Sequence, residues 1–351
     1  TEGGGMTRIE TVGGVTIIQG DSLESLREFP DKSIHCCVTS PPYWGLRNYG
    51  VAGQLGLEST QAEYVEKMVA VFREVRRVLR DDGTLWLNLG DSYAANRSYQ
   101  VNSTKGGKKH GPAQSVEGKG SSVPLGLKSK DLVGIPWRTA FALQADGWYL
   151  RQDIIWAKPN PMPESVRDRC TKAHEYIFLL SKSAKYYFDS EAIQEPVAAS
   201  TSARLSQDVD NQIGSDRVPG KTNGAMKTVG GRRSKRDSFK RVSKETLIPG
   251  QNNTSHREER PENEYPLETR NKRSVWTVTT KPFKGAHFAT FPPDLIEPCI
   301  LAGCPPNGFV LDPFAGSGTT GLVAQRHGRQ AMLLELNPAY VDMAVARIKA
   351  G

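Results

Sequence analysis

The chain has 351 residues, which is enough to bury a full-sized core in one large domain or in two. Its formal net charge of +8 and its pI of about 9.2 favour an acidic partner such as nucleic acid. The sequence contains no apolar run that could span a membrane, no signal-peptide pattern and no C-x-x-C pair, so we expect a cytoplasmic protein with reduced thiols, no metal site and no membrane partner.

The beginning of the chain alternates segments that are typical of strands and helices. Residues 15–20 and 33–38 predict short strands, and the residues between them predict a short helix capped by Asp21 or Ser22. Apolar side chains at helical spacing then predict an amphipathic helix over residues 61–79.

The strand over residues 33–38 runs directly into a turn with two consecutive prolines, which we call the proline turn. It consists of Ser40, Pro41, Pro42 and Tyr43. Because proline has no N–H group to donate to a sheet, the strand must stop there. Ligands bind at the carboxyl ends of strands in open α/β sheets, so the proline turn is a candidate binding element.

The middle of the chain contains two irregular regions. Residues 94–130 are rich in Gly, Ser and Lys and predict a mobile loop, and residues 191–274 are polar, basic and without apolar periodicity. The elements predicted around them are a strand over residues 84–89, a helix over 136–144 and strands over 149–156 and 175–180.

The end of the chain returns to regular alternation. The elements predicted there are a helix over residues 292–302, a strand over 308–311, a helix over 319–327, a strand over 330–335 and a helix over 338–349. Strands that alternate with helices imply an α/β fold with a doubly wound, mostly parallel sheet.

A glycine-rich turn follows the strand that ends at Leu311. Its glycines, Gly316, Gly318 and Gly321, match G-x-G-x-x-G, a pattern that also occurs in dinucleotide sites. A Walker phosphate loop is excluded because no Lys precedes Thr319 or Thr320. The glycines could instead let the backbone approach the methionine portion and ribose of a cofactor, with Asp312 accepting from a cationic amino group.

The next strand ends at Glu335, an acid that is well placed to hold both hydroxyls of a ribose. NAD sites and S-adenosylmethionine sites share that feature. The run Asp312-Pro313-Phe314, taken together with the proline turn, favours S-adenosylmethionine over NAD and thus over a dehydrogenase.

The residues of the proline turn suit methyl transfer to an exocyclic amine of a base. The lone pair of such an amine is delocalised into the ring, so the enzyme needs acceptors for the amino hydrogens. The Ser40 hydroxyl and the Pro41 carbonyl can serve as these acceptors, and Tyr43 can stack on a base rotated out of the duplex. For stacking, we expect the ring of Tyr43 to matter more than its hydroxyl.

Transfer to C5 of cytosine would require a cysteine nucleophile in the equivalent turn. The chain does contain Pro298-Cys299, but within a predicted helix, where Cys299 belongs to the apolar face. We therefore expect Cys299 to be a core residue, and we set C5 chemistry aside.

These motifs, in this order, resemble the amino-methyltransferases of DNA restriction–modification and phage systems, and more narrowly their β-ordered group. The resemblance covers residues 15–190 and 275–350, and residues 191–274 carry almost none of its motifs. It implies a catalytic half over residues 6–190 with the mobile loop 94–130, a target-recognition region over 191–274, and a cofactor-binding half over 275–351.

The resemblance also implies individual roles. Asp21 would contact the adenine amine of the cofactor and Glu335 its ribose. The predicted cofactor-binding residues are Asp21, His287, Phe288, Phe291, Pro292, Asp312, Phe314, Gly316, Ser317, Gly318, Thr319, Thr320 and Glu335. In that group a Ser at the first catalytic position leans toward cytosine N4, so Ser40 favours cytosine, with adenine N6 as the alternative.

Double-stranded DNA is the expected partner. The predicted DNA-binding residues are Lys108, Lys109, Lys158, Arg232, Arg233, Lys235 and Arg236. An RNA methyltransferase and a DNA-binding protein of the same fold without turnover are the alternatives. The motifs are compatible with a monomer or a homodimer, and with a cognate restriction endonuclease as a further partner.

Overall fold

A computed structural model describes residues 8–46, 49–94, 126–198, 269–280 and 291–351. The chain divides into two compact units, Thr1–Ile193 with Arg273–Gly351, and Gln194–Lys272. In the second unit, the described residues form a short antiparallel pair, β7 (Glu195–Pro196) with β8 (Thr269–Arg270), and Arg270 Nε lies 3.0 Å from Glu195 Oε1.

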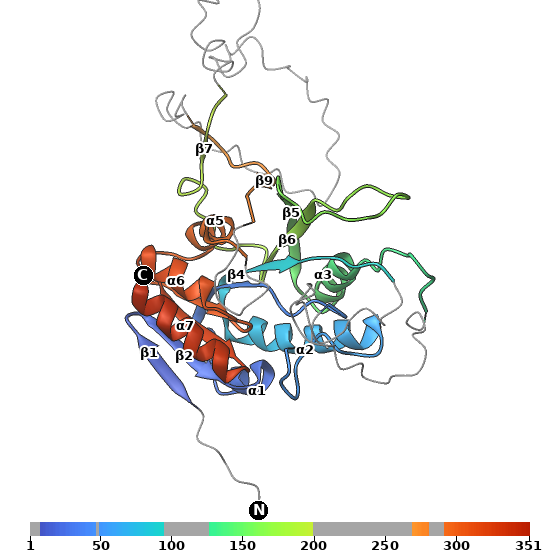
Figure 1. Ribbon diagram of the computed structural model, residues 1–351. Coiled ribbons are helices and arrows are strands. Elements are labelled where there is room, and N and C mark those ends of the chain that lie inside the picture. Colours follow the sequence, from blue (N-terminus) through green and yellow to red (C-terminus); the bar gives the residue numbers. More distant parts are fainter. Residues whose placement is uncertain (1–7, 47–48, 95–125, 199–268, 281–290) are drawn as a thin grey trace, which may run out of the picture. The chain divides into compact units, whose positions relative to one another are not determined.

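The first unit is built on a nine-stranded sheet in the order β1-β2-β11-β10-β3-β4-β6-β5-β9 (Figure 1). The strands are β1 (Ile9–Val12), β2 (Val15–Gln19), β3 (Ile34–Thr39), β4 (Leu79–Leu89), β5 (Tyr149–Ala157), β6 (His174–Ser181), β9 (Val275–Thr277), β10 (Phe309–Asp312) and β11 (Gln330–Glu335). The run from β2 to β4 is parallel, whereas β6 is antiparallel to both of its neighbours and β1 is antiparallel to β2. The predicted α/β fold with a mostly parallel sheet is confirmed.

Helices cover both faces of this sheet. They are α1 (Ser22–Arg27), α2 (Gln61–Val78), α3 (Ile135–Ala145), α5 (Pro293–Gly303), α6 (Thr319–Arg326) and α7 (Pro338–Ala350). Neighbouring residues of β10 face opposite sides: Val310 packs in a cluster with α5, α6 and α7, and Leu311 in a cluster with α1, α2 and α3. Each face therefore has its own apolar core.

Three of these helices, α1, α2 and α7, begin at a residue whose side chain caps the helix. Thr60 accepts from the backbone N–H of Glu63 at the start of α2, and the Glu63 carboxylate accepts in return from the Thr60 N–H, which forms a capping box. Asp21 caps α1 in the same sense, since its Oδ1 accepts from Leu23 N at 2.9 Å.

The largest local difference from the sequence prediction lies in β4. The sequence predicted a strand over residues 84–89, but β4 begins at Leu79. Its pairing with β3 jumps from Ile34–Leu79 to Cys36–Thr84, so the intervening residues of β4 bulge out of the ladder. In the described residues we find no helix long and apolar enough to cross a membrane.

Candidate functional site

A cavity of about 960 Å³ lies at the carboxyl ends of the central strands. The proline turn after β3 and the glycine-rich turn after β10 both line it, together with Asn88 near the end of β4 and Glu335 at the end of β11. Parallel strands bring their carboxyl ends to one edge of a sheet, which is why segments so far apart in the sequence meet here. The two turns singled out from the sequence thus share one cavity.

All four residues of the proline turn line the cavity. The turn is fixed from behind by Tyr64 of α2, whose hydroxyl donates to the Pro42 carbonyl at 2.9 Å. The side chain of Tyr43 reaches across the end of β4, and its hydroxyl donates to Glu175 Oε2 at 2.6 Å. Burial raises the pKa of Tyr43 well above its ordinary value, so the phenol stays protonated.

The ring of Tyr43 lies directly against the backbone of Gly90. A Cβ atom at Gly90 would lie 2.5 Å from Tyr43 Cε2. We expect Gly90→Ala to displace the ring and to lower the rate of the reaction at this site by about 10-fold or more, because small misplacements of positioned groups are costly. The control is Gly14→Ala, where the nearest atom would be 3.7 Å from the new Cβ. Steady-state rates for both variants test this, and equal rates for the two would contradict it.

Glu175, Asn88 and Lys158 form a polar group around Tyr43 whose arrangement was not predicted from the sequence. Asn88 Nδ2 donates to the Tyr176 carbonyl at 3.0 Å and lies 3.3 Å from Glu175 Oε2. Lys158 pairs with Glu175 Oε1, and its ammonium lies 4.2 Å from the centre of the Trp156 ring. Lys158, which was predicted to bind DNA, thus lines the cavity and forms an ion pair with Glu175.

Asp312 at the end of β10 is 1% exposed and does not line the cavity. It accepts from the Thr39 hydroxyl at 2.6 Å, from the Thr320 hydroxyl at 2.6 Å and from the Phe314 N–H at 3.0 Å. Burial raises the pKa of Asp312 to about 6. Asp312 ties the start of the glycine-rich turn to Thr39, the residue before Ser40. Its predicted contact with a cofactor's amino group stays a prediction.

Three other predicted cofactor residues, Pro292, Gly318 and Thr320, do not line the cavity either. Thr320 is fully buried in its bond to Asp312, Gly318 packs against Ala344 of α7, and Pro292 caps α5. Gly318 has a φ of +74°, and a Cβ there would lie 2.8 Å from Ala344 Cβ, so this position requires glycine on both counts.

The predicted cofactor residues that do line the cavity are Asp21, Phe291, Phe314, Gly316, Ser317, Thr319 and Glu335. Glu335 is fixed by backbone N–H groups, since Oε2 accepts from Gly316 at 2.8 Å and Oε1 from Asn337 at 2.7 Å. Burial raises the pKa of Glu335. Arg347 of α7, which the sequence did not single out, holds the turn from outside by donating to Ser317 Oγ and Thr319 Oγ1.

Several predicted site residues lie outside the described part of the chain. They are His287, Phe288, Lys108, Lys109, Arg232, Arg233, Lys235 and Arg236. Their roles remain predictions.

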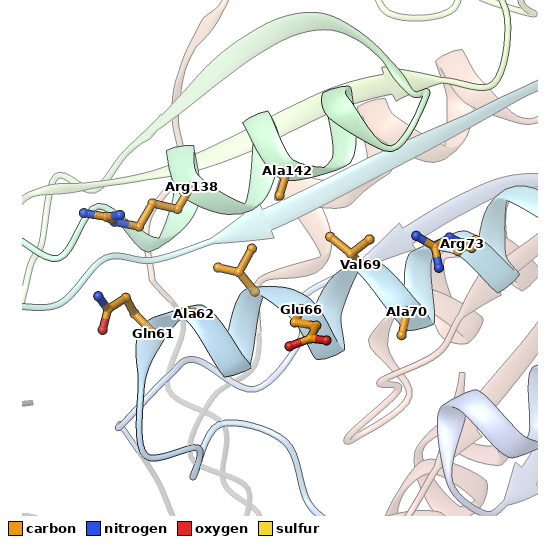
Figure 2. A pocket seen from close by; sticks show the side chains of 9 residues that line it. Gln61, Ala62, Glu66, Val69, Ala70, Arg73, Arg138 and Ala142 are labelled. Atoms are coloured by element: carbon orange, nitrogen blue, oxygen red, sulfur yellow. The ribbon is translucent and has the colours of Figure 1, made fainter. Parts of the chain in front are cut away.

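A second cavity, of about 560 Å³, lies between α2 and α3 (Figure 2). Its lining includes Glu66 and Arg73 from α2 and Arg138 from α3. None of the residues predicted from the sequence lines it, so we place the functional site in the larger cavity.

The fold is that of DNA methyltransferases of known structure. PvuII DNA methyltransferase, described as cytosine-N4-specific, matches with a TM-score of 0.57 at 19% identity, over 97% of this chain and 93% of that one. A DNA modification methylase from Thermus thermophilus, solved in complex with S-adenosyl-L-methionine, matches with a TM-score of 0.52 at 22% identity, over 97% of this chain and 96% of that one.

Sequence comparison specifies the family. The model of the N6/N4 DNA methylases matches residues 34–346, and the chain belongs to this family. Type II methyltransferase M.Cfr9I of Citrobacter freundii is 45% identical over 96% of this chain and 88% of its own length. Type II methyltransferase M.SmaI of Serratia marcescens is 42% identical over 95% and 90%. The resemblance inferred from the motifs is confirmed, and the dehydrogenase alternative is set aside.

Proposed function

We propose that the protein transfers a methyl group from S-adenosylmethionine to the exocyclic N4 of a cytosine that has been rotated out of double-stranded DNA. The observation that carries this proposal is the shared cavity, in which the Ser40 hydroxyl and the glycine-rich turn face the same space. Adenine N6, with the same chemistry, is the alternative. Ser40 favours cytosine, since that is the residue that leans toward cytosine N4 in the group that the motifs resemble.

The lining residues suit S-adenosylmethionine. The carboxylates of Asp21 and Glu335 provide acceptors for an adenine amine and for ribose hydroxyls, and Phe291 and Phe314 provide apolar walls. The cofactor supplies an electrophilic methyl group: the bond from sulfur to this carbon breaks, sulfur keeps the electron pair, and the amine nitrogen forms the new bond. The chain's own task is to hold the amine in line and to take up its proton.

Ser40 and Tyr43 would act on the base. The Ser40 oxygen accepts one amino hydrogen and so directs the nitrogen lone pair toward the methyl group. The ring of Tyr43 provides a stacking surface for a flipped base. No covalent bond between enzyme and base is needed.

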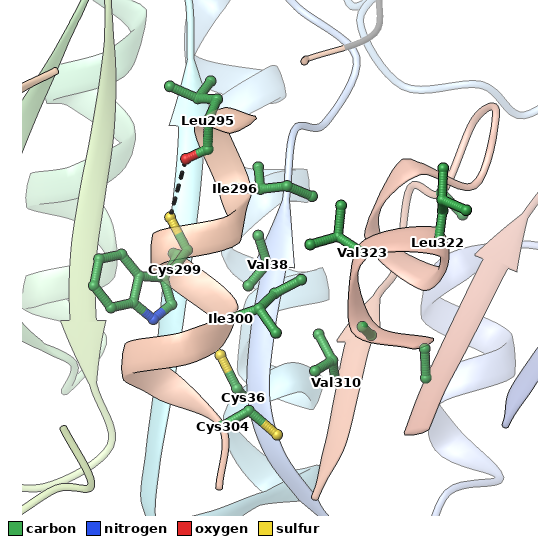
Figure 3. Close-up of a cluster of buried hydrophobic side chains, with 14 of the residues drawn as sticks. Cys36, Val38, Leu295, Ile296, Cys299, Ile300, Cys304, Val310, Leu322 and Val323 are labelled. Atoms are coloured by element: carbon green, nitrogen blue, oxygen red, sulfur yellow. Dashed lines mark hydrogen bonds between the residues drawn. The ribbon is translucent and has the colours of Figure 1, made fainter. Parts of the chain in front are cut away.

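A cysteine nucleophile for C5 transfer has no support in this geometry. Cys299 lies in α5, is fully buried, and points its sulfur at the Leu295 carbonyl 3.8 Å away, among the apolar side chains shown in Figure 3. It does not line the cavity. The sequence-based interpretation of Cys299 as a core residue agrees with this position.

We propose that residues 191–274, with 94–130, supply most phosphate contacts. Neutralising Arg232, Arg233, Lys235 and Arg236 together is then expected to weaken DNA binding and to reduce its salt dependence, by about one unit of slope for each phosphate that loses its cationic partner. Titrations of labelled duplex at several salt concentrations measure this slope. An unchanged slope would show that these charges do not bind phosphates.

The test of the proposed activity is methyl transfer from labelled S-adenosylmethionine to genomic DNA, followed by sequencing that separates N4-methylcytosine from N6-methyladenine. N4-methylcytosine supports the proposal and N6-methyladenine selects the alternative. Label in RNA but not in DNA, or no transfer at all, would contradict it.

A further inference from the structure

The side chains around Tyr43 form a chain of hydrogen bonds that leads away from the proline turn. The Ser40 hydroxyl donates to Tyr43 Oη at 3.4 Å, and Tyr43 Oη donates to Glu175 Oε2 at 2.6 Å. Lys158 pairs with the other carboxylate oxygen of Glu175. All four side chains line the cavity, and those of Lys158 and Glu175 are only 18% and 15% exposed.

The direction of this chain is set at its far end. The hydroxyl of Tyr43 faces two acceptors, Glu175 Oε2 at 2.6 Å and Asn88 Oδ1 at 3.2 Å, and the shorter contact directs its proton at Glu175. The oxygen of Tyr43 is then an acceptor, and the proton of Ser40 points to it. The lone pairs of Ser40 are left for a donor in the cavity, which is the polarity that an amino group requires. The raised pKa of Tyr43 agrees with a phenol that keeps its proton.

We propose that Glu175 is a positioning residue that sets this direction and receives, through Tyr43 and Ser40, the proton released by methyl transfer. This inference rests on the proposed function. When the nitrogen–methyl bond has formed, the amine nitrogen carries a positive charge and must lose a proton. That proton passes to Ser40 Oγ as the proton of Ser40 moves to Tyr43 and that of Tyr43 moves to Glu175, which becomes neutral and later releases its proton to water in the cavity.

A carboxylate is a strong enough base to take up the proton of the methylated amine. Because the amine's lone pair is delocalised into the ring, the methylated cation is a much stronger acid than a carboxylic acid. Glu175 can therefore take the proton even beside the ammonium group of Lys158. Lys158 in turn is held over the ring of Trp156, which fixes the ion pair in place.

The decisive variant is Glu175→Gln, because glutamine can still accept a hydrogen bond from Tyr43 but cannot take up the proton. We expect kcat to fall by about 100-fold. The Kd for S-adenosylmethionine, the KM for DNA and the melting temperature should stay close to those of the wild type.

The matched control is Glu164→Gln, in the connection that leads from β5 to β6. Glu164 also pairs with a cation, Arg169, but does not line the cavity. Its kcat should stay within about 2-fold of the wild type, as expected for the loss of a partly exposed ion pair. Comparable losses in the two variants would overturn the proposal, as would a Glu175→Gln enzyme with wild-type kcat.

A double-mutant cycle tests whether Tyr43 and Glu175 act as one chain. Tyr43→Phe keeps the ring but removes the relay, so this structure predicts a loss similar to that of Glu175→Gln, although the sequence alone suggested that the ring would suffice. The double variant should be no slower than either single variant. If the losses of kcat in the two single variants multiply in the double variant, the proposal is overturned. If Glu175→Gln does not fold, a wild-type kcat in Tyr43→Phe overturns the proposal by itself. Failure of the proposed function is separate, because it would appear in the wild type as methylation of another base or as no transfer.

Discussion

Ser40→Ala is expected to lower kcat for methyl transfer by about 100-fold or more, the size of effect seen when one positioned hydrogen-bonding group is removed from an active site. The variant loses the acceptor that orients the amine, and it also loses the first hydroxyl of the chain that leads to Glu175. Single-turnover measurements with labelled S-adenosylmethionine report this step directly. Because Ser40 acts on the base, calorimetry should give a Kd for S-adenosylmethionine within about 2-fold of the wild type.

Ser33→Ala is the matched control for Ser40→Ala. Ser33 lies next to the opposite end of β3, and its exposed hydroxyl donates to the Pro30 carbonyl at 2.8 Å. We expect wild-type turnover in this variant. A Ser40→Ala enzyme that turned over normally but bound S-adenosylmethionine poorly would reverse the roles that we propose for the two turns.

Asp312→Ala is expected to have the largest effect on cofactor binding. The change removes the acceptor for three donors, the hydroxyls of Thr39 and Thr320 and the Phe314 N–H, at a site that is 1% exposed. Each buried donor left without a partner costs about 1–3 kcal/mol. We expect the free energy of unfolding to fall by about 3 kcal/mol or more, and the affinity for S-adenosylmethionine to fall at least about 10-fold as the glycine-rich turn loosens.

Thr39→Val provides the graded comparison for Asp312→Ala, because it removes only one of the three hydrogen bonds. Its loss of unfolding free energy should be about 1 kcal/mol. Urea unfolding gives the stabilities and calorimetry gives the affinities. An Asp312→Ala protein with wild-type stability and affinity would contradict the role of Asp312 in joining the two turns.

The raised pKa of Asp312 also predicts a pH dependence of stability. Its pKa is about 6 in the folded protein and has an ordinary value of 3.8. Between these values the folded state holds the proton and the unfolded state loses it, so the contribution of Asp312 to stability is fully present below about pH 4 and falls as the pH rises through 6. Relative to Asp312→Asn, the wild type should therefore lose about 2 kcal/mol of unfolding free energy from pH 4 to pH 7. A constant difference would exclude an elevated pKa.

The fold could be predicted from local sequence because its strands and helices carry strong patterns. The helix predicted over residues 61–79 is α2 (Gln61–Val78), and the strand predicted over 330–335 is β11 (Gln330–Glu335). The strands that were not predicted are short: β1 has four residues, β9 has three, and β7 and β8 have two each, which is too few for alternation to show.

The two turns of the site could be predicted because each is a continuous motif. The hydrogen-bond partners of Tyr43 could not be predicted from the sequence. Glu175 is 132 positions away in the chain and reaches the site only because β6 lies antiparallel beside β4. Asp312 shows a different limit: its position in a motif indicates that it matters, but its hydrogen bonds to Thr39 and Thr320 could not be predicted from the sequence.

The most direct test of the central claim is to sequence a plasmid modified by the wild-type protein and S-adenosylmethionine with a method that separates N4-methylcytosine, N6-methyladenine and C5-methylcytosine. Ser40, the residue that leans toward cytosine N4 in the group that the motifs resemble, predicts N4-methylcytosine within one short recognition sequence, and none in a reaction with Ser40→Ala at matched enzyme and time. N6-methyladenine, C5-methylcytosine or an unmodified plasmid from the wild-type reaction would contradict the proposed cytosine N4 transfer.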